Sequence, residues 1–279
     1  MNQTAFRVSA QFGHDDRHQT LPHPVTAKAT NYSRGETPAH SHPRAQLIFA
    51  GSGVMRVETE SGCWVVPPVR GVWVPANVVH RVIMLGSVEM RTLYIRPDAS
   101  PGLPDTCCLI EVSPLLRALI LALLDEPLAY DLAGRGGQIA ALALKELRFL
   151  KIPALHLPMP GEPRLQRLCQ EIIANPESRK TLETLAGEQA TSSRTLARQF
   201  HRETGMSFRQ WRQQARLVEA LGHLANNMPV AQVAEKLGYL SASAFTAMFK
   251  RTLGIEPRRY FSGELTTQAD QLPSREHSR

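Results

Sequence analysis

The sequence predicts a two-domain α+β protein: an N-terminal antiparallel β-sandwich or barrel with helices after it, and an all-helical C-terminal domain. Residues 25–97 contain short β-rich runs broken by Gly, Pro and Asn, which is typical of antiparallel sandwiches and barrels. Residues 163–262 have helical patterns throughout and contain an internal near-repeat. Between the two parts, residues 151–162 are rich in proline and are expected to form a stiff, extended linker. With 279 residues, the chain is long enough for two cores.

The two ends of the chain, residues 1–24 and 263–279, are polar and are expected to be flexible. No apolar stretch suitable for a signal peptide opens the sequence, and the longest apolar run, 114–124, is interrupted by Arg117 and is too short to cross a bilayer. The cysteines show no C-x-x-C spacing, which favours reduced thiols: Cys63, Cys107, Cys108 and Cys169. We therefore expect a soluble cytoplasmic protein with no membrane partner.

Two helices are expected after the β-rich region, at residues 113–124 and 137–150, within an N-terminal domain that spans 25–150. Ser113 followed by Pro114 is a typical helix start. Both helices are too apolar to stand alone, so we expect them to pack on the sheet or to form a homodimer contact. Their leucine stripes comprise Leu115, Leu116, Leu119, Leu123, Leu142 and Leu147.

The positive charge of the chain is concentrated in its C-terminal part. The net charge is +7, and residues 163–262 carry 15 Lys and Arg against 8 Asp and Glu, whereas the rest of the chain carries 17 of each. A basic domain attached to a neutral one suggests that the basic part binds a polyanion. A solvated helical surface would carry the same charge, so the charge alone does not establish that this part binds a polyanion. The sequence motifs are needed to distinguish the two.

The near-repeat predicts two helix-turn-helix units. Both LAGEQATSSRTLARQF (185–200) and VAEKLGYLSASAFTAMF (233–249) contain an apolar residue followed by Ala, then a turn, a Ser, and two apolar residues four apart. The small alanine lets two helices cross closely, and Ser192 and Ser241 are placed to cap each second helix. Between the units, residues 207–227 have apolar residues at helical spacing and predict a long connecting helix.

These motifs resemble the DNA-binding domain of the AraC/XylS family of bacterial transcription regulators. The matching residues are LAxxxAxxSxRxLxRxF, then Arg216, Leu217 and Ala220, then VAxxLGYxSxSAFxxMFKRxxGIxPxxYF ending at Phe261. The resemblance implies a seven-helix domain whose two recognition helices enter successive major-groove segments on one face of promoter DNA. It also implies control of transcription, more often by activation, with RNA polymerase as a partner.

Carried over by position, the resemblance implies DNA contacts from both recognition helices. Those of the first helix are Ser193, Arg194, Ala197 and Arg198, and those of the second are Ala242, Ser243, Thr246 and Ala247. Phosphate contacts are expected from Lys250, Arg251, Arg258 and Arg259. Arginine can bind guanine O6 and N7 or a phosphate. Since Ala247 stands where many relatives have a base-reading arginine, the second helix is expected to read DNA shape, phosphate or thymine methyl groups.

In the N-terminal domain, His40-Ser-His42, then Gln46 and Gly53, and the stretch 75–80 ending in His80 resemble the two motifs of the cupin fold. Alternation on a strand places the first two histidines on one face, and a barrel can bring the third beside them. Three imidazoles suit a divalent transition metal such as Zn, Fe, Mn or Ni. The candidate metal ligands are His40, His42 and His80, and the candidate effector-binding residues are these three with Gln46 and Trp73.

Gln46 departs from the cupin pattern, because metal-binding cupins have glutamate there and an amide is a weaker ligand. Two residues also replace glycines common in turns, Ala190 and Asn77, so both are expected at or near positive φ.

Several functions stay open for this pocket: a metal-dependent sensor, a metal-free pocket for a small-molecule effector, and histidines that only hydrogen-bond in a filled barrel. Two further alternatives are a cupin metalloenzyme with a DNA-binding domain, and an effector-independent DNA binder whose barrel only dimerises. Without the glutamate and with no substrate-facing base in view, the sequence predicts no catalytic residues and requires no cofactor.

Overall fold

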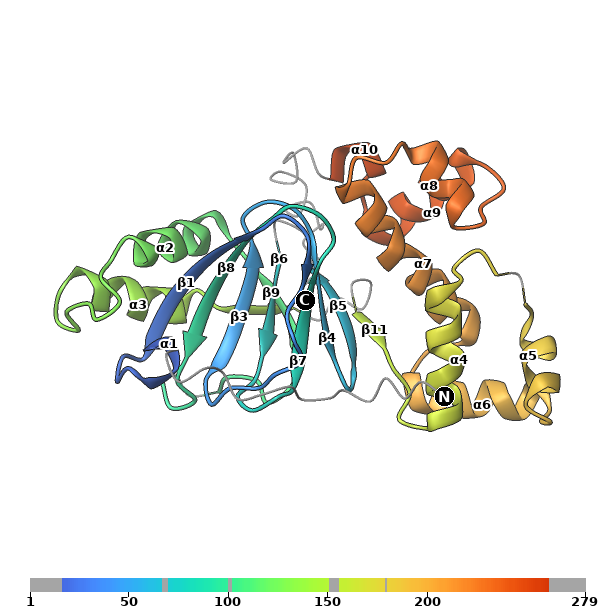
Figure 1. The fold of residues 1–279 in the computed structure, drawn as a ribbon, viewed down its shortest axis with the longest axis horizontal. Coiled ribbons are helices and arrows are strands. Elements are labelled where there is room, and N and C mark those ends of the chain that lie inside the picture. The colour runs from blue at the N-terminus through green and yellow to red at the C-terminus, as the bar shows by residue number, and fades with distance from the viewer. Residues whose placement is uncertain (1–16, 67–69, 100–101, 151–155, 179, 261–279) are drawn as a thin grey trace, which may run out of the picture.

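The computed structural model describes residues 17–66, 70–99, 102–150, 156–178 and 180–260. It shows two antiparallel sheets and two long helices in the N-terminal part, and a helical domain beside them (Figure 1). Residues 1–16 and 263–279 of the expected flexible ends, and residues 151–155 of the expected linker, lie outside the described residues. Within the described part of the chain, no helix has both the length and the apolar character needed to cross a membrane.

The first sheet has six strands in the order β1-β8-β3-β6-β9-β10. Its strands are β1 (Val25–Tyr32), β3 (Ala45–Ala50), β6 (Arg70–Val74), β8 (Val88–Ile95), β9 (Cys108–Glu111) and β10 (Arg148–Leu150). The second sheet has five strands in the order β11-β5-β4-β7-β2. These are β2 (Gly35–Glu36), β4 (Met55–Thr59), β5 (Gly62–Val66), β7 (His80–Met84) and β11 (His156–Pro158). Every pairing is antiparallel, so the predicted sandwich is confirmed.

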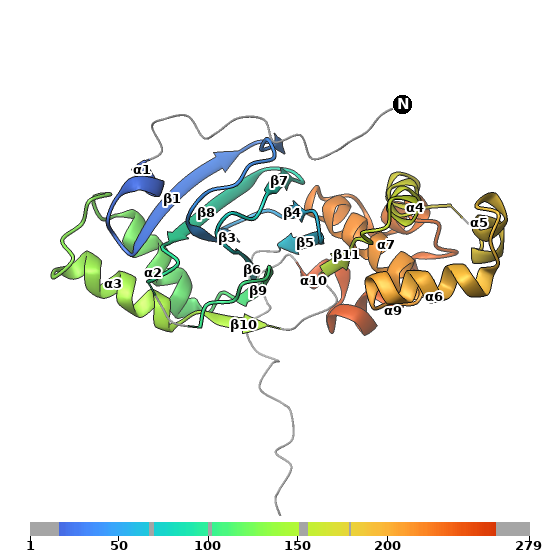
Figure 2. The same ribbon diagram turned by 90° about the horizontal axis from the view of Figure 1, so that it is seen from below.

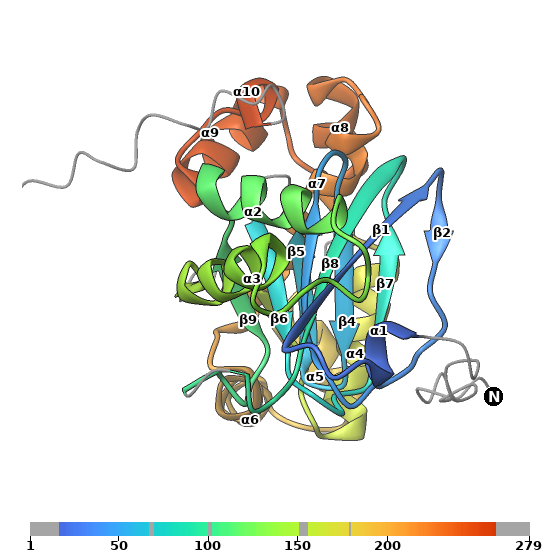
Figure 3. The same ribbon diagram turned by 90° about the vertical axis from the view of Figure 1, so that its left-hand side faces the viewer.

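The six-stranded sheet is buried on both faces. Ile48 and Val72 face the second sheet and belong to the core between the sheets, whereas Leu47, Phe49 and Trp73 belong to a separate core under the helices. These helices are α2 (Pro114–Leu124) and α3 (Arg135–Lys145), and Figure 3 shows them in front of this sheet. The Ser113 side chain accepts a hydrogen bond from the Leu116 backbone N–H, which caps α2 as expected.

The second expected helix was predicted to run to residue 150, and this is wrong at its C-terminal end. Helix α3 ends at Lys145, and Arg148–Leu150 form β10 beside β9. Phe149 packs edge-on against Trp73 with ring centroids 5.7 Å apart, which holds this strand against the sheet. Of the leucine stripes, Leu116, Leu119 and Leu123 are buried in the helix–sheet core and are therefore not available to a second subunit. Leu115, Leu121, Leu132 and Leu142 are exposed.

The N-terminal segment is held in place over its described part, residues 17–24, where flexibility was expected. It begins with the short helix α1 (Arg17–Thr20). The buried Arg44 side chain donates hydrogen bonds to the backbone carbonyls of Gln19, Leu21 and His23. Because all three acceptors lie in this segment, one guanidinium anchors it to the sheet.

The C-terminal domain contains seven helices within residues 163–260, which confirms the expected architecture. They are α4 (Pro163–Ala174), α5 (Leu182–Glu188), α6 (Ser193–Thr204), α7 (Phe208–Ala225), α8 (Val230–Lys236), α9 (Ala242–Leu253) and α10 (Pro257–Tyr260). Ser192 and Ser241 cap α6 and α9 by accepting from the backbone N–H of Thr195 and Ala244, each at 3.1 Å. Both recognition helices end at a glycine in the left-handed conformation.

The connecting helix α7 joins the two helix-turn-helix units. It has 18 residues, which makes it about 27 Å long. Its buried Trp211 packs on Phe200 of α6, and α8 and α9 follow at its other end. Figure 2 shows α6 and α9 on the same side of the domain, with α4 on the other.

The two domains pack on each other through α7 and the five-stranded sheet. Trp211 Nε1 donates to the Pro158 carbonyl of β11 at 2.7 Å, and Arg56 of β4 pairs with Glu219 of α7 at 2.8 Å. Strand β11 comes from the expected linker, and it is extended because it pairs with β5. The apolar core between the sheets continues into the helical domain.

Candidate effector site and DNA interface

Three histidines meet between the two sheets. His40 forms an antiparallel bridge with His80, the first residue of β7, through backbone hydrogen bonds of 2.8 and 2.9 Å. The ring centroids of His40 and His42 lie 4.4 and 5.1 Å from that of His80, and one ring nitrogen from each residue lies within 4.8 Å of the others. The structure therefore brings together the three candidate metal ligands.

The turn at Asn77 supports this cluster and has the expected backbone, and a second turn, at Gly53, also has a positive φ. Asn77 has a φ of 63°, and its N–H donates to the His42 carbonyl at 2.8 Å, which links the two histidine-bearing segments. Gly53 has a φ of 79°, and a Cβ at this position would overlap the Ser87 carbonyl oxygen. Only glycine fits there without a shift of the backbone.

Every histidine of the cluster has its Nδ1 atom next to a backbone carbonyl oxygen. The acceptors are Pro38 O for His40 at 2.7 Å, Arg44 O for His42 at 2.6 Å and Val78 O for His80 at 2.9 Å. A carbonyl oxygen can only accept, so each Nδ1 carries the proton and donates it. The Nε2 atoms of His42 and His80 both lie 2.9 Å from Oε1 of Gln46 on β3.

Burial disfavours the charged form of His40 and His80. His80 is fully buried and His42 is nearly so, while His40 is half-buried. Burial lowers the pKa of His80 to about 3, and the adjacent His40 contributes in the same direction. Burial also lowers the pKa of His40. Neutral imidazoles with protonated Nδ1 present lone pairs at Nε2, the form in which histidine binds metals.

Trp73 does not join the histidines. It is buried on the opposite face of the six-stranded sheet, where its Nε1–H donates to Pro104 O at 2.8 Å. Its register partner is Leu47, one residue beyond Gln46, and adjacent residues of a strand point to opposite faces. Tyr94 takes the place beside the cluster instead: it pairs with Gln46 in the sheet and packs edge-on against His42 at 5.2 Å. Sequence reasoning missed it because cross-strand register cannot be read locally.

The first recognition helix, α6, presents a basic outer face. Arg194 and Arg198 are exposed and one turn apart, and no ion pair within the described residues engages either of them. Ser193 and Ala197 are half-buried on the same side, opposite the buried Leu196 and Phe200. Ala190, in the turn before α6, has a φ of 50°, which confirms the expected left-handed backbone.

The second recognition helix, α9, presents a smaller and less charged face. Ser243 and Ala247 are exposed, and Ala242 and Thr246 are half-buried. Lys250 and Arg251 are exposed at its C-terminal end, where Lys250 pairs with Glu256 at 3.1 Å, and Arg258 and Arg259 are exposed on α10.

Leu240 was missed in the sequence analysis. It lies immediately before the cap of α9 with 91% of its surface exposed. The sequence feature that could have identified Leu240 is the presence of a large apolar residue in the turn between two helices.

Comparisons with known proteins also divide the chain into an N-terminal and a C-terminal domain. Residues 22–147 match the protein family described as AraC-like ligand binding domain, and residues 185–263 match a family described as Helix-turn-helix domain. The HTH-type transcriptional regulator NimR of Escherichia coli (strain K12) is 37% identical over 235 residues, which cover 84% of this chain and 85% of NimR.

Two further matches are more distant. The HTH-type transcriptional regulator RipA of Corynebacterium glutamicum is 33% identical over 108 residues, or 39% of this chain and 33% of RipA. Among solved structures, ToxT from Vibrio cholerae covers 86% of this chain and 98% of its own, at 10% identity and a TM-score of 0.37. The two matched domains and the NimR relationship over most of both chains lead to one conclusion: this chain belongs to the AraC family, as a DNA-binding transcriptional regulator with a ligand-binding domain.

Proposed function

We propose that the chain is a metal-dependent one-component regulator, in which a divalent transition metal held by His40, His42, His80 and Gln46 forms or completes the effector site. The observation that carries this proposal is the shared orientation of the histidines, each with its Nδ1–H on a backbone carbonyl. Metal-binding histidines typically hold their second nitrogen in this way, because it fixes the tautomer and orients the ring.

Proton counting supports a cation at this position. His42 and His80 each have two oxygen acceptors, one carbonyl and the shared Gln46 Oε1, but a neutral imidazole carries only one proton. A doubly protonated ring would satisfy both oxygens, yet burial disfavours that form at His80. With the proton on Nδ1, two nitrogen lone pairs and an amide oxygen face one another. A metal ion bound by all of them removes this repulsion.

A metal-free pocket requires one change to this arrangement. If the Gln46 amide is turned by half a rotation, its NH₂ group donates to both Nε2 atoms. The two states can be separated by metal content. A metal, when bound, would supply positive charge and coordination positions for a small-molecule effector.

At the other end of the molecule, we propose that α6 and α9 bind successive major-groove segments of a promoter. Arg194 and Arg198 would contact bases or phosphates, and Ser193, Ala197, Ala242, Ser243 and Thr246 would pack on the groove. Lys250, Arg251, Arg258 and Arg259 would contact phosphates. The exposed Leu240 would pack against a thymine methyl group, consistent with the uncharged face of α9.

The remaining parts of the proposal follow from this role. The protein would act in the cytoplasm, without enzymatic activity, and would activate transcription through RNA polymerase. The exposed leucines of α2 and α3 would contribute to a homodimer contact: Leu115, Leu121 and Leu142.

Metal analysis of protein purified without a histidine tag tests the proposal. We expect about one divalent transition metal per chain, which is lost in His40→Ala and His80→Ala. The matched control is His223→Ala, which removes a half-buried histidine of α7 outside the cluster. Circular dichroism checks that each variant is folded.

Footprinting on the protein's own promoter regions, located by genome-wide binding, then compares the loaded and metal-stripped protein. Metal-free wild-type protein that still responds to growth conditions would favour the metal-free pocket. Occupancy that never changes under any condition would contradict a sensor role altogether.

A further inference from the structure

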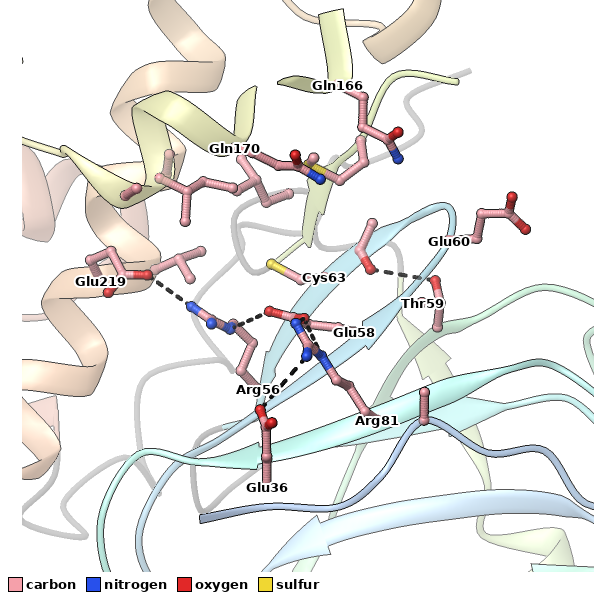
Figure 4. Close-up of a pocket in the computed structure, with 18 of the residues that line it drawn as sticks. Glu36, Arg56, Glu58, Thr59, Glu60, Cys63, Arg81, Gln166, Gln170 and Glu219 are labelled. Atoms are coloured by element: carbon pink, nitrogen blue, oxygen red, sulfur yellow. Dashed lines mark hydrogen bonds and ion pairs between the residues drawn. The ribbon is translucent and has the colours of Figure 1, made fainter. Parts of the chain in front are cut away.

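A cavity lies between the two domains and borders the histidine cluster, since Pro38, whose carbonyl oxygen accepts a hydrogen bond from His40, is one of its lining residues. It has a volume of about 490 Å³. One wall is the outer face of the five-stranded sheet, with Arg56 and Glu58 of β4 and Arg81 of β7. The other wall is formed by α4 and α7 of the DNA-binding domain, as Figure 4 shows. His80 lies on the opposite face of this sheet, between the two sheets.

The lining has more negative than positive charge. Four carboxylates face two guanidinium groups in the cavity: Glu36, Glu58, Glu60 and Glu219 against Arg56 and Arg81. Both guanidinium groups are already engaged, Arg56 with Glu58 and Glu219 at 2.8 Å each, and Arg81 with Glu58 at 2.6 Å and Glu36 at 3.7 Å.

Glu60 differs from the other carboxylates. It is exposed at the end of β4, and no ion pair within the described part of the chain includes it. An anionic ligand would have to displace a carboxylate from an arginine, whereas a cation meets uncompensated negative charge.

Much of the remaining lining is apolar. Ile173 and Val218 contribute from the DNA-binding domain, and Cys63, Leu157 and Met159 from the sheet side. Burial raises the pKa of Cys63 to about 12, so its thiol is neutral and adds no charge. In Figure 4, the amides of Gln166 and Gln170 lie across the cavity from Glu60. A ligand for this cavity therefore has an apolar body and one cationic end.

We propose that this interdomain cavity binds a small organic cation with an aromatic or aliphatic body, and that this ligand controls how the DNA-binding domain docks on the sheet. Its walls come from both domains, so a bound molecule contacts both at once. Such a ligand binds the docked arrangement better than a separated one, and by linkage it shifts the equilibrium toward docking. Only this last consequence rests on the proposed regulatory function; binding in the cavity does not.

Three probes of matched size and different charge test the class of ligand: benzamidine, benzamide and benzoate. On the full-length protein without DNA, isothermal titration should show saturable benzamidine binding with a dissociation constant of about 1 mM or tighter. Benzamide and benzoate should bind about tenfold more weakly or not at all, because neither is positively charged. Equal binding of the three probes, or no saturable benzamidine binding, would overturn the proposal.

Two variants with matched controls locate the site. Gln170→Trp fills the cavity from the exposed side of α4 and should abolish benzamidine binding, while Arg167→Trp, on a different face of α4, should not. Glu60→Gln should weaken benzamidine about fivefold by removing one charge, whereas Asp105→Asn, at an exposed position outside the cavity, should leave it unchanged. Binding that persists in Gln170→Trp would place benzamidine elsewhere and contradict the assignment.

A DNA titration completes the test. Benzamidine should change the DNA dissociation constant of the wild-type protein about threefold or more, with no change in Gln170→Trp. Binding without this change would overturn the control role. Failure to bind DNA at all would instead count against the proposed regulator.

Discussion

His80 and Arg81 are consecutive residues of β7, and their side chains lie on opposite faces of the five-stranded sheet. His80 is fully buried between the sheets with its Nε2 atom 2.9 Å from Gln46, whereas Arg81 pairs with Glu58 in the interdomain cavity at 2.6 Å. One strand therefore carries a residue of each proposed site. Because the two residues share one strand, ligands bound on either face of β7 would act on the same element.

Replacement of Gln46 by glutamate tests the metal site directly. The substitution Gln46→Glu adds a negative charge to a set of neutral nitrogen ligands and should raise metal affinity about tenfold or more. Competition with a chromophoric chelator measures this affinity. Gln138→Glu, at an exposed position of α3 outside both proposed sites, is the control and should leave it unchanged. An unchanged affinity in Gln46→Glu would mean that Gln46 is not a ligand.

Arg194 and Lys250 should affect DNA binding differently. Arg194→Ala should cost about 1–3 kcal/mol at the preferred promoter and relax the sequence preference, if the guanidinium reads a guanine. Lys250→Ala should weaken binding to all sequences alike and reduce the dependence on salt by about one counterion. Anisotropy titrations at several salt concentrations, on specific and scrambled duplexes, separate the two effects. A uniform loss in Arg194→Ala would reassign that residue to a phosphate.

The ion pair between Arg56 and Glu219 should stabilise the docked domains. Their side chains are 17% and 27% exposed and lie 2.8 Å apart. A double-mutant cycle with Arg56→Leu and Glu219→Leu should give a coupling free energy of about 1–2 kcal/mol, typical of a charged hydrogen bond that is partly buried. Urea unfolding monitored by Trp fluorescence provides the values. Additive single and double variants would show that the pair contributes nothing to docking.

His156 should make the protein less stable in acid. Burial lowers its pKa to about 4, its Nε2 has no hydrogen-bond partner among the described residues, and its ring stacks on Trp64 at 4.5 Å. Since the folded-state pKa lies below the unfolded value of 6.5, the contribution to stability is constant above pH 6.5 and is lost as the pH falls toward 4. The total loss from this group is about 3 kcal/mol.

The variant His156→Phe keeps the stacking and removes the titration. Its free energy of unfolding should therefore fall less than that of the wild type between pH 6.5 and 4. Above pH 7 the two proteins should differ by a constant amount, which is the internal control. Parallel curves over the whole range would show that His156 is not the group responsible.

Much of the functional architecture could be predicted from the sequence because it depends on local spacing. The caps at Ser192 and Ser241, the buried stripes of α6 and α9, and the left-handed turns at Asn77 and Ala190 involve residues within a few positions of one another. The expected grouping of His40 and His42 with His80 is also found, although the expectation that the first two lie on a strand is wrong: they lie in a segment before β3, where only His40 forms an isolated bridge.

Only the tertiary structure decided the features that depend on contacts between distant segments. The sheet register turns Trp73 away from the histidines and brings Tyr94 to them. Packing on the sheet, not local propensity, makes β10 from the end of an expected helix. The Arg56–Glu219 pair joins residues that are 163 positions apart, and the interdomain cavity likewise lies between distant segments. A local sequence pattern cannot predict contacts over such a separation. By itself, the sequence determined the two domains, the paired recognition helices and the histidine set, because short-range periodicity and turn chemistry specify them, whereas long-range packing specifies what surrounds them.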